Sequence, residues 1–62
     1  MTKAEWTETF ERTLADKTHW PLEDVREFMR QTGEDHWDAL IANDACPVEA
    51  ARDEYDGIAD SQ

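Results

Sequence analysis

The 62-residue chain has little cysteine, glycine, proline or basic side chain. Its single cysteine excludes a disulfide within the chain, which favours a reducing, cytoplasmic setting. No apolar run has signal-peptide or transmembrane length, so we expect neither secretion nor membrane insertion. Alternating β-branched segments are missing, which argues against a β-sheet. The six Lys and Arg residues are scattered among acids, so the chain lacks the basic patch that direct DNA or RNA binding requires.

Acidic side chains and large aromatic rings are what the chain does have. Asp and Glu number 16, and the formal net charge is -10. Such a charge opposes folding through self-repulsion, and a chain of this length has room for one small core. Three tryptophans, two phenylalanines and one tyrosine supply the kind of apolar area that stabilises a small core. We therefore expect a single folded domain over residues 1–62.

A capping box marks the start of the first predicted helix. Thr2 and Glu5 have the spacing at which a hydroxyl and a carboxylate satisfy the free amides of a first helical turn. Apolar side chains then recur every four residues, at Trp6, Phe10 and Leu14. This helix is expected over residues 2–17. It should end before Trp20 and Pro21, because the residue before a proline disfavours helical geometry.

Prolines and glycines divide the remaining chain into three further segments. Pro21 and Pro47 suit the first position of a helix, while Gly33 and Gly57 suit helix ends. Asp35 is expected to cap the third helix, which should end near residue 43. The side chains predicted to face the core are Leu22, Val25, Phe28 and Met29, then Trp37, Leu40 and Ile41, and finally Val48, Ala51 and Tyr55. The sequence thus predicts an all-α, compact bundle of three to four short helices with a frayed tail from about residue 59.

Three short motifs carry a family resemblance. They are the segment from Val25 to Gly33, the run His36-Trp37-Asp38 followed by Ala39-Leu40, and the run Val48-Glu49-Ala50-Ala51. Over residues 22–58 they resemble the UBA-like helical domain found at the start of elongation factor Ts. The resemblance implies a three-helix bundle, to which the helix over residues 2–17 is an N-terminal addition.

The same resemblance implies a function in protein binding. Members of the family often bind partners with the loop between their first two helices and with their last helix. By position, Thr32 and Gly33 lie in that loop, and Tyr55 lies on the last helix. Ubiquitin-binding members carry Met-Gly-Phe or Met-Gly-Tyr in the loop, so the resemblance does not extend to ubiquitin binding.

Trp20 is a further candidate partner-binding residue. It lies in a connection between helices, beside His19 and Pro21. A tryptophan at such a place either staples two helices together or stays partly exposed as an interface anchor. Both interpretations stay open from the sequence alone.

Patterns typical of catalysis or metal binding are weak. No Ser/His/Asp, Cys/His or phosphate-binding signature has its usual local context, so we expect no enzymatic activity and no cofactor. The available metal ligands lack the closely spaced pairs of a zinc site, and no metal is expected. They are His19, Asp35, His36 and Cys46. Cys46 is expected to be half-buried at a helix start and unreactive, because surrounding acids weaken thiolate character.

Two interpretations of the acidity remain. In the first, the acids solubilise a small protein-protein interaction or regulatory module, a cytoplasmic monomer or weak homodimer with a protein partner. In the second, the acids form the interface and mimic a nucleic-acid backbone, as in small phage proteins that inhibit basic DNA- or RNA-binding proteins. The distribution of the acids discriminates between them. An even spread favours the first interpretation, and a single acidic face favours the second.

Overall fold

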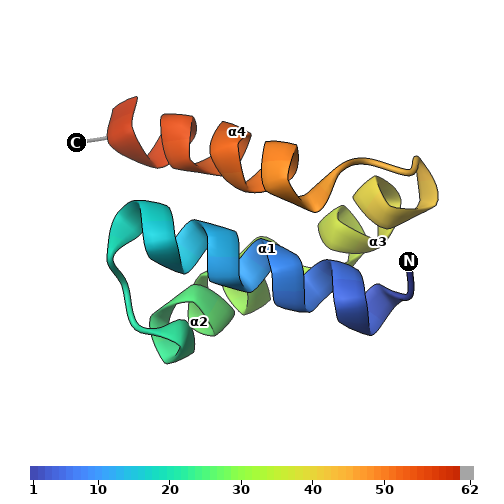
Figure 1. The fold of residues 1–62 in the computed structure, drawn as a ribbon, viewed down its shortest axis with the longest axis horizontal. Helices are drawn as coiled ribbons and strands as arrows, with labels where there is room; N and C mark the ends of the chain where they lie inside the picture. Colours follow the sequence, from blue (N-terminus) through green and yellow to red (C-terminus); the bar gives the residue numbers. More distant parts are fainter. Residues whose placement is uncertain (61–62) are drawn as a thin grey trace.

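The computed structural model describes residues 1–60, which form four α-helices and no β-strand (Figure 1). In chain order they are α1 (Lys3–Thr18), α2 (Leu22–Thr32), α3 (Glu34–Ala42) and α4 (Pro47–Asp60). Helix α1 lies between α4 and α2, and α4 runs in the same direction as α1. The predicted all-α bundle of short helices is confirmed. Within residues 1–60, no helix combines the length and the apolar character needed to cross a membrane.

Helix α1 begins and ends with satisfied backbone groups. The Glu5 N–H donates to Thr2 Oγ1 at 3.2 Å, which is the hydroxyl half of the predicted capping box. At the other end His19 adopts left-handed geometry with a φ of 61°, and its N–H donates to the Ala15 carbonyl at 2.8 Å. Pro21 then precedes α2 instead of taking its first position, because its ψ of 154° is extended.

Gly33 forms the whole connection between α2 and α3. Its φ of 107° favours glycine, but its ψ of 138° is extended, so it is not the left-handed cap that the sequence predicts. Its N–H donates to the Met29 carbonyl at 3.2 Å, and its carbonyl accepts from the His36 N–H at 3.2 Å. Because α3 starts directly at Glu34, the prediction that Asp35 caps this helix is wrong. Asp35 lies inside the first turn.

Helix α4 opens at Pro47, as predicted. Cys46, just ahead of it, is exposed rather than half-buried, since it lies in the connection before the packed part of the helix. The prediction that Gly57 ends the helix is wrong, because the helix continues to Asp60. Ile58, beyond the glycine, packs against the core and favours this continuation. The rest of the predicted tail, residues 61–62, lies outside the described residues.

The core forms where α1 meets the other helices. Three aromatic rings lie at its centre, with the Phe10 centroid 5.4 Å from that of Trp6 and 4.8 Å from that of Trp37. The buried side chains among the described residues are Trp6, Phe10, Leu14, Val25, Met29, Trp37, Pro47, Ala50 and Ala51. The helix that the family resemblance treats as an addition therefore supplies the middle of the core.

Two residues of the predicted apolar faces lie on the surface. Leu22 is 42% exposed and Val48 is 46% exposed, so the prediction of burial is wrong at both positions. Leu22 is the first residue of α2, and Val48 lies off the buried side of α4, which is formed by Pro47, Ala50 and Ala51. Helix α4 packs instead through Ala50 and Ala51, whose short side chains allow close approach to α1.

Candidate partner-binding surfaces

Two of the four predicted partner-binding residues lie together. Trp20, from the α1–α2 connection, and Tyr55, from α4, line one cleft of about 210 Å³ at the C-terminal end of α1. The Lys17 ammonium lies 6.0 Å from the centre of the Tyr55 ring, within the range of a cation–π contact. We call this the end cleft. The end cleft brings together Trp20 and Tyr55, which are 35 positions apart in the sequence.

The other two predicted residues lie elsewhere. Thr32 and Gly33 are at the far end of α2, about 15 Å along the helix from its start beside Trp20. The Thr32 hydroxyl donates to the Phe28 carbonyl at 3.0 Å, one turn back in its own helix. The structure therefore divides the predicted site into two places, and only the Trp20 side has a cleft formed with α4.

Trp20 is half-buried and combines the two roles considered for it. On one side its ring packs edge-on to Phe28, with centroids 6.2 Å apart and planes at 62°, which staples the connection to α2. Together with Phe28, the Trp20 ring also lines a second cleft, of about 280 Å³, which we call the α2 cleft. This cleft is lined by Trp20, Asp24, Glu27, Phe28 and Gln31.

Trp20 differs from the other two tryptophans in the hydrogen bonding of its indole N–H. Trp6 donates to the Ala45 carbonyl at 2.8 Å, and Trp37 donates to the Met29 carbonyl at 2.9 Å. Trp20 Nε1 has no acceptor within residues 1–60, and no side-chain nitrogen or oxygen there is both buried and unsatisfied. Its N–H is therefore open to an acceptor from outside the chain.

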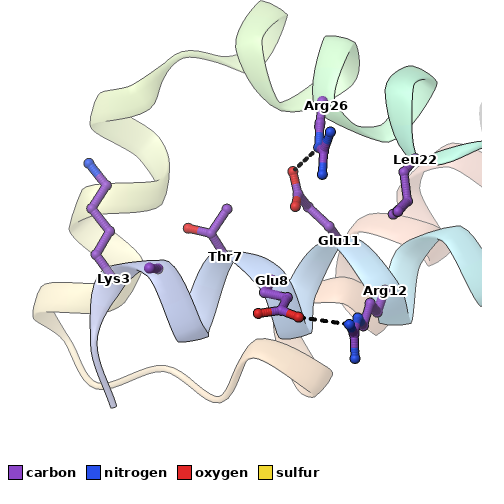
Figure 2. Close-up of a pocket in the computed structure, with 8 residues that line it drawn as sticks. Lys3, Thr7, Glu8, Glu11, Arg12, Leu22 and Arg26 are labelled. Carbon is purple, nitrogen blue, oxygen red and sulfur yellow. Dashed lines mark hydrogen bonds and ion pairs between the residues drawn. The ribbon is translucent and has the colours of Figure 1, made fainter.

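A longer groove of about 700 Å³ runs between α1 and α2 (Figure 2). Arg26 reaches from α2 to Glu11 on α1, with Nε 3.3 Å from Oε2, while Arg12 pairs with Glu8 on its own helix at 2.8 Å. Exposed Leu22 lies at the α2 side. The charges that line this groove largely neutralise one another.

Lys3, at the end of the same groove, binds two acids of α3. Its Nζ lies 2.7 Å from Glu34 Oε1 and 2.9 Å from Asp38 Oδ1. Hydrogen bonds to Glu34 and then to Asp38 raise the pKa of Lys3 above its ordinary value, so this side chain stays charged. The ion pairs tether α3 to the start of α1. Because they are well exposed, they contribute little to stability.

Charge is unevenly divided between the two halves of the chain. Residues 1–33 carry seven acidic and five basic side chains, a formal charge of -2. Residues 34–60 carry nine acidic and one basic side chain, a formal charge of -8. The acids themselves are spread over all four helices, and the difference in net charge arises because five of the six basic residues lie on α1 and α2.

Helix α4 bears a regular row of exposed acids. Their spacing of four, three and four residues places all of them on one helical stripe, with about 5.5 Å between neighbours. None of them makes an ion pair or side-chain hydrogen bond with another residue of 1–60. We call this set the α4 acidic row, and it consists of Glu49, Asp53, Asp56 and Asp60.

The residues considered as metal ligands do not come together. Within residues 1–60, no three His, Cys, Asp or Glu side chains are grouped so as to hold a metal ion. His36 Nε2 instead lies 3.3 Å from Glu54 Oε1, joining α3 to α4. Its ring packs edge-on against Trp37, with centroids 4.6 Å apart.

Comparisons of the chain with known protein families, curated proteins and solved structures found no match. The UBA-like resemblance therefore stays a prediction. The function has to be inferred from the chemistry of the surfaces.

Sequence reasoning missed Asp24 and Phe28 as parts of a surface site. It assigned Phe28 to the apolar stripe, which is a role within one helix. A signal for the cleft exists in the spacing, because positions 20, 24, 27, 28 and 31 fall on one side of a helix. Trp20 lies before α2 begins. Its place beside the other four residues therefore becomes clear only when the structure shows that the connection continues along the same side of α2.

Proposed function

We propose that this protein is a small non-catalytic protein-binding module whose partner is basic. The observation that carries the proposal is the division of charge, with -8 on residues 34–60 against -2 on residues 1–33. A surface that served solubility alone would intersperse both signs of charge, whereas residues 34–60 have one basic side chain against nine acids. An uneven negative field attracts a basic surface over about one Debye length, which is longer at low salt, and orients the encounter.

The ion pairs within the chain also favour α4 as the helix to which a partner docks. On α1 and α2, four basic residues form ion pairs with neighbouring acids; they are Lys3, Arg12, Arg26 and Arg30. The α4 acidic row has no such compensation within residues 1–60, so its charge is available to a partner. The proposal includes a cytoplasmic setting, on the ground of the single cysteine, and a monomer or weak homodimer.

A second candidate, mimicry of a nucleic-acid backbone, is favoured by the regularity of the α4 acidic row. Its four charges are about 5.5 Å apart, whereas one strand of DNA carries a charge about every 3.4 Å along the axis. A basic groove that accepts a phosphate backbone would therefore meet a similar, though sparser, line of negative charge. In this case the partner is a DNA- or RNA-binding protein, and it should release the chain when nucleic acid is added.

Affinity capture at two salt concentrations tests the proposal. The immobilised full chain is incubated with a lysate of its source organism at about 0.05 M and about 0.5 M salt, and the captured proteins are identified. We expect basic proteins that are bound at low salt and released at high salt. Addition of duplex DNA or RNA separates the candidates, because displacement indicates mimicry and retention indicates an ordinary docking module.

Matched double variants locate the interaction. Asp53→Asn with Asp56→Asn removes two charges from the α4 acidic row and should reduce capture severalfold. Asp16→Asn with Glu23→Gln removes two exposed charges from α1 and α2 and should leave capture near the parental level. Equal losses in both variants would show a response to net charge alone. Partners that are insensitive to salt would contradict the proposal.

A further inference from the structure

The α2 cleft has two aromatic walls and a negative edge. The Trp20 and Phe28 rings pack edge-on against each other at 62°, and both residues line the cleft. With a volume of about 280 Å³, the cleft is the size of one long side chain rather than of a helix. Ring faces attract cations, because their π electrons carry partial negative charge.

Asp24 supplies the uncompensated charge of this cleft. It is exposed and makes no ion pair or side-chain hydrogen bond within residues 1–60. The neighbouring carboxylate of Glu27 is already engaged, because Arg30 donates to one oxygen and Gln31 Nε2 donates to the other at 3.3 Å. A cation entering the cleft therefore finds a carboxylate that has no competing partner.

Trp20, which lines both this cleft and the end cleft, also carries an indole N–H donor. The other two indole N–H groups are satisfied within the fold, whereas this one has no acceptor among residues 1–60. Tryptophans with one packed face and one free polar group are typical anchors of protein interfaces. The cleft thus offers an aromatic wall, an anion and a donor within one small area.

We propose that the α2 cleft binds an arginine side chain of a basic protein partner. The guanidinium lies against the Trp20 and Phe28 rings and donates to the Asp24 carboxylate, while the Trp20 N–H donates to a backbone carbonyl of the partner. This assignment rests on the proposed function, to which it adds a second point of contact, on α2 and apart from the α4 acidic row. Arginine fits better than lysine, because its guanidinium is planar, stacks on aromatic rings and donates two parallel hydrogen bonds to one carboxylate.

Titration with small blocked peptides tests the site directly. Acetyl-Gly-Arg-Gly-amide is added to the ¹⁵N-labelled full chain, and amide and indole N–H shifts are followed by NMR. We expect the shifts to be centred on Trp20, Asp24, Phe28 and Gln31. The lysine peptide should bind about threefold more weakly or worse, and the citrulline peptide, a neutral isostere of arginine, should give no saturable shift.

Two variants and one control measure the contributions. Asp24→Asn should weaken arginine-peptide binding about three- to tenfold, and Trp20→Phe should weaken it by a similar factor. Asp16→Asn makes the same charge change on an exposed residue of α1 and should leave binding within about twofold of the parental chain. Circular dichroism melts of all three variants check that each remains folded.

Shifts centred on the α4 acidic row instead of the α2 cleft would overturn the inference. So would equal weakening by Asp16→Asn and Asp24→Asn, or citrulline binding as tight as arginine binding. The proposed function fails separately. If basic partners are captured but Asp24→Asn binds them and the peptide normally, only the cleft assignment is wrong. If the peptide binds in the cleft but no basic protein is captured, only the proposed function is wrong.

Discussion

The three tryptophans differ in where their indole N–H groups donate. Trp6 donates to the Ala45 carbonyl in a connection, and Trp37 donates to the Met29 carbonyl near the end of α2, which also accepts from the Gly33 N–H. Trp20 donates to nothing within residues 1–60. The helical period identified the first two as core residues, and the structure confirms this. The helical period makes no prediction about the burial of Trp20, because this residue lies in a connection between helices.

Two leucines allow the burial assignments to be tested by the same substitution. Leu14 is fully buried, so Leu14→Ala should lower the free energy of unfolding by about 2–5 kcal/mol. Leu22 is 42% exposed, so Leu22→Ala should cost less than about 1 kcal/mol. Urea denaturation followed by circular dichroism measures both. Because a domain of this size has only a few kcal/mol of stability, Leu14→Ala should be largely unfolded in buffer. Similar losses at the two positions would contradict the assigned burial.

At the scale of single elements, local signals placed most helix boundaries and failed at the predicted Asp35 cap and at the predicted Gly57 stop. The Thr2 cap and the Pro47 start depend on the backbone geometry of one turn, which the local sequence determines. The predicted stop at Gly57 failed because one glycine costs a helix only about 1 kcal/mol. Packing of Tyr55 and Ile58 on either side of it offsets such a cost.

Alanine substitutions at the two glycines should have opposite effects. Gly57 lies within α4, and a Cβ there would meet no atom within 4 Å, so Gly57→Ala should raise stability by about 0.5–1 kcal/mol. Gly33 has a φ of 107°, which L side chains rarely adopt, so Gly33→Ala should lower stability by about 1–3 kcal/mol. Thermal melts compare the variants with the parental chain. A loss of stability in Gly57→Ala would show that the helix is interrupted at this position.

At the scale of the whole molecule, the net negative charge opposes folding through self-repulsion and also produces an uneven electrostatic field around the protein. The five ion pairs formed by Lys and Arg in the described part of the chain each have at least one well-exposed partner, so each contributes little to stability. Three of them neutralise acids of α1 and α2, and two neutralise Glu34 and Asp38 on α3. The uneven net charge of the two halves supports a basic partner over a purely solubilising role.

Salt should stabilise this protein. Screening weakens both the exposed ion pairs and the repulsion that comes from a net charge of -10, and the repulsion involves more charges. We therefore expect a higher Tm at about 0.5 M than at about 0.02 M monovalent salt. Thermal denaturation followed by circular dichroism measures this, and chloride salts of two different cations separate screening from specific ion binding. An unchanged or lower Tm at high salt would contradict the dominance of repulsion.

The sequence by itself determined the helical class, most of the helix starts and the aromatic residues at the centre of the core. These depend on the helical period and on capping within one turn, which neighbouring residues control. Only the tertiary structure decided that Trp20 meets Tyr55 while Thr32 and Gly33 lie apart, and that Asp24 joins an aromatic cleft. It also decided that Leu22 and Val48 are exposed. Such outcomes depend on how α1 packs between α2 and α4, and this packing involves residues far apart in the chain.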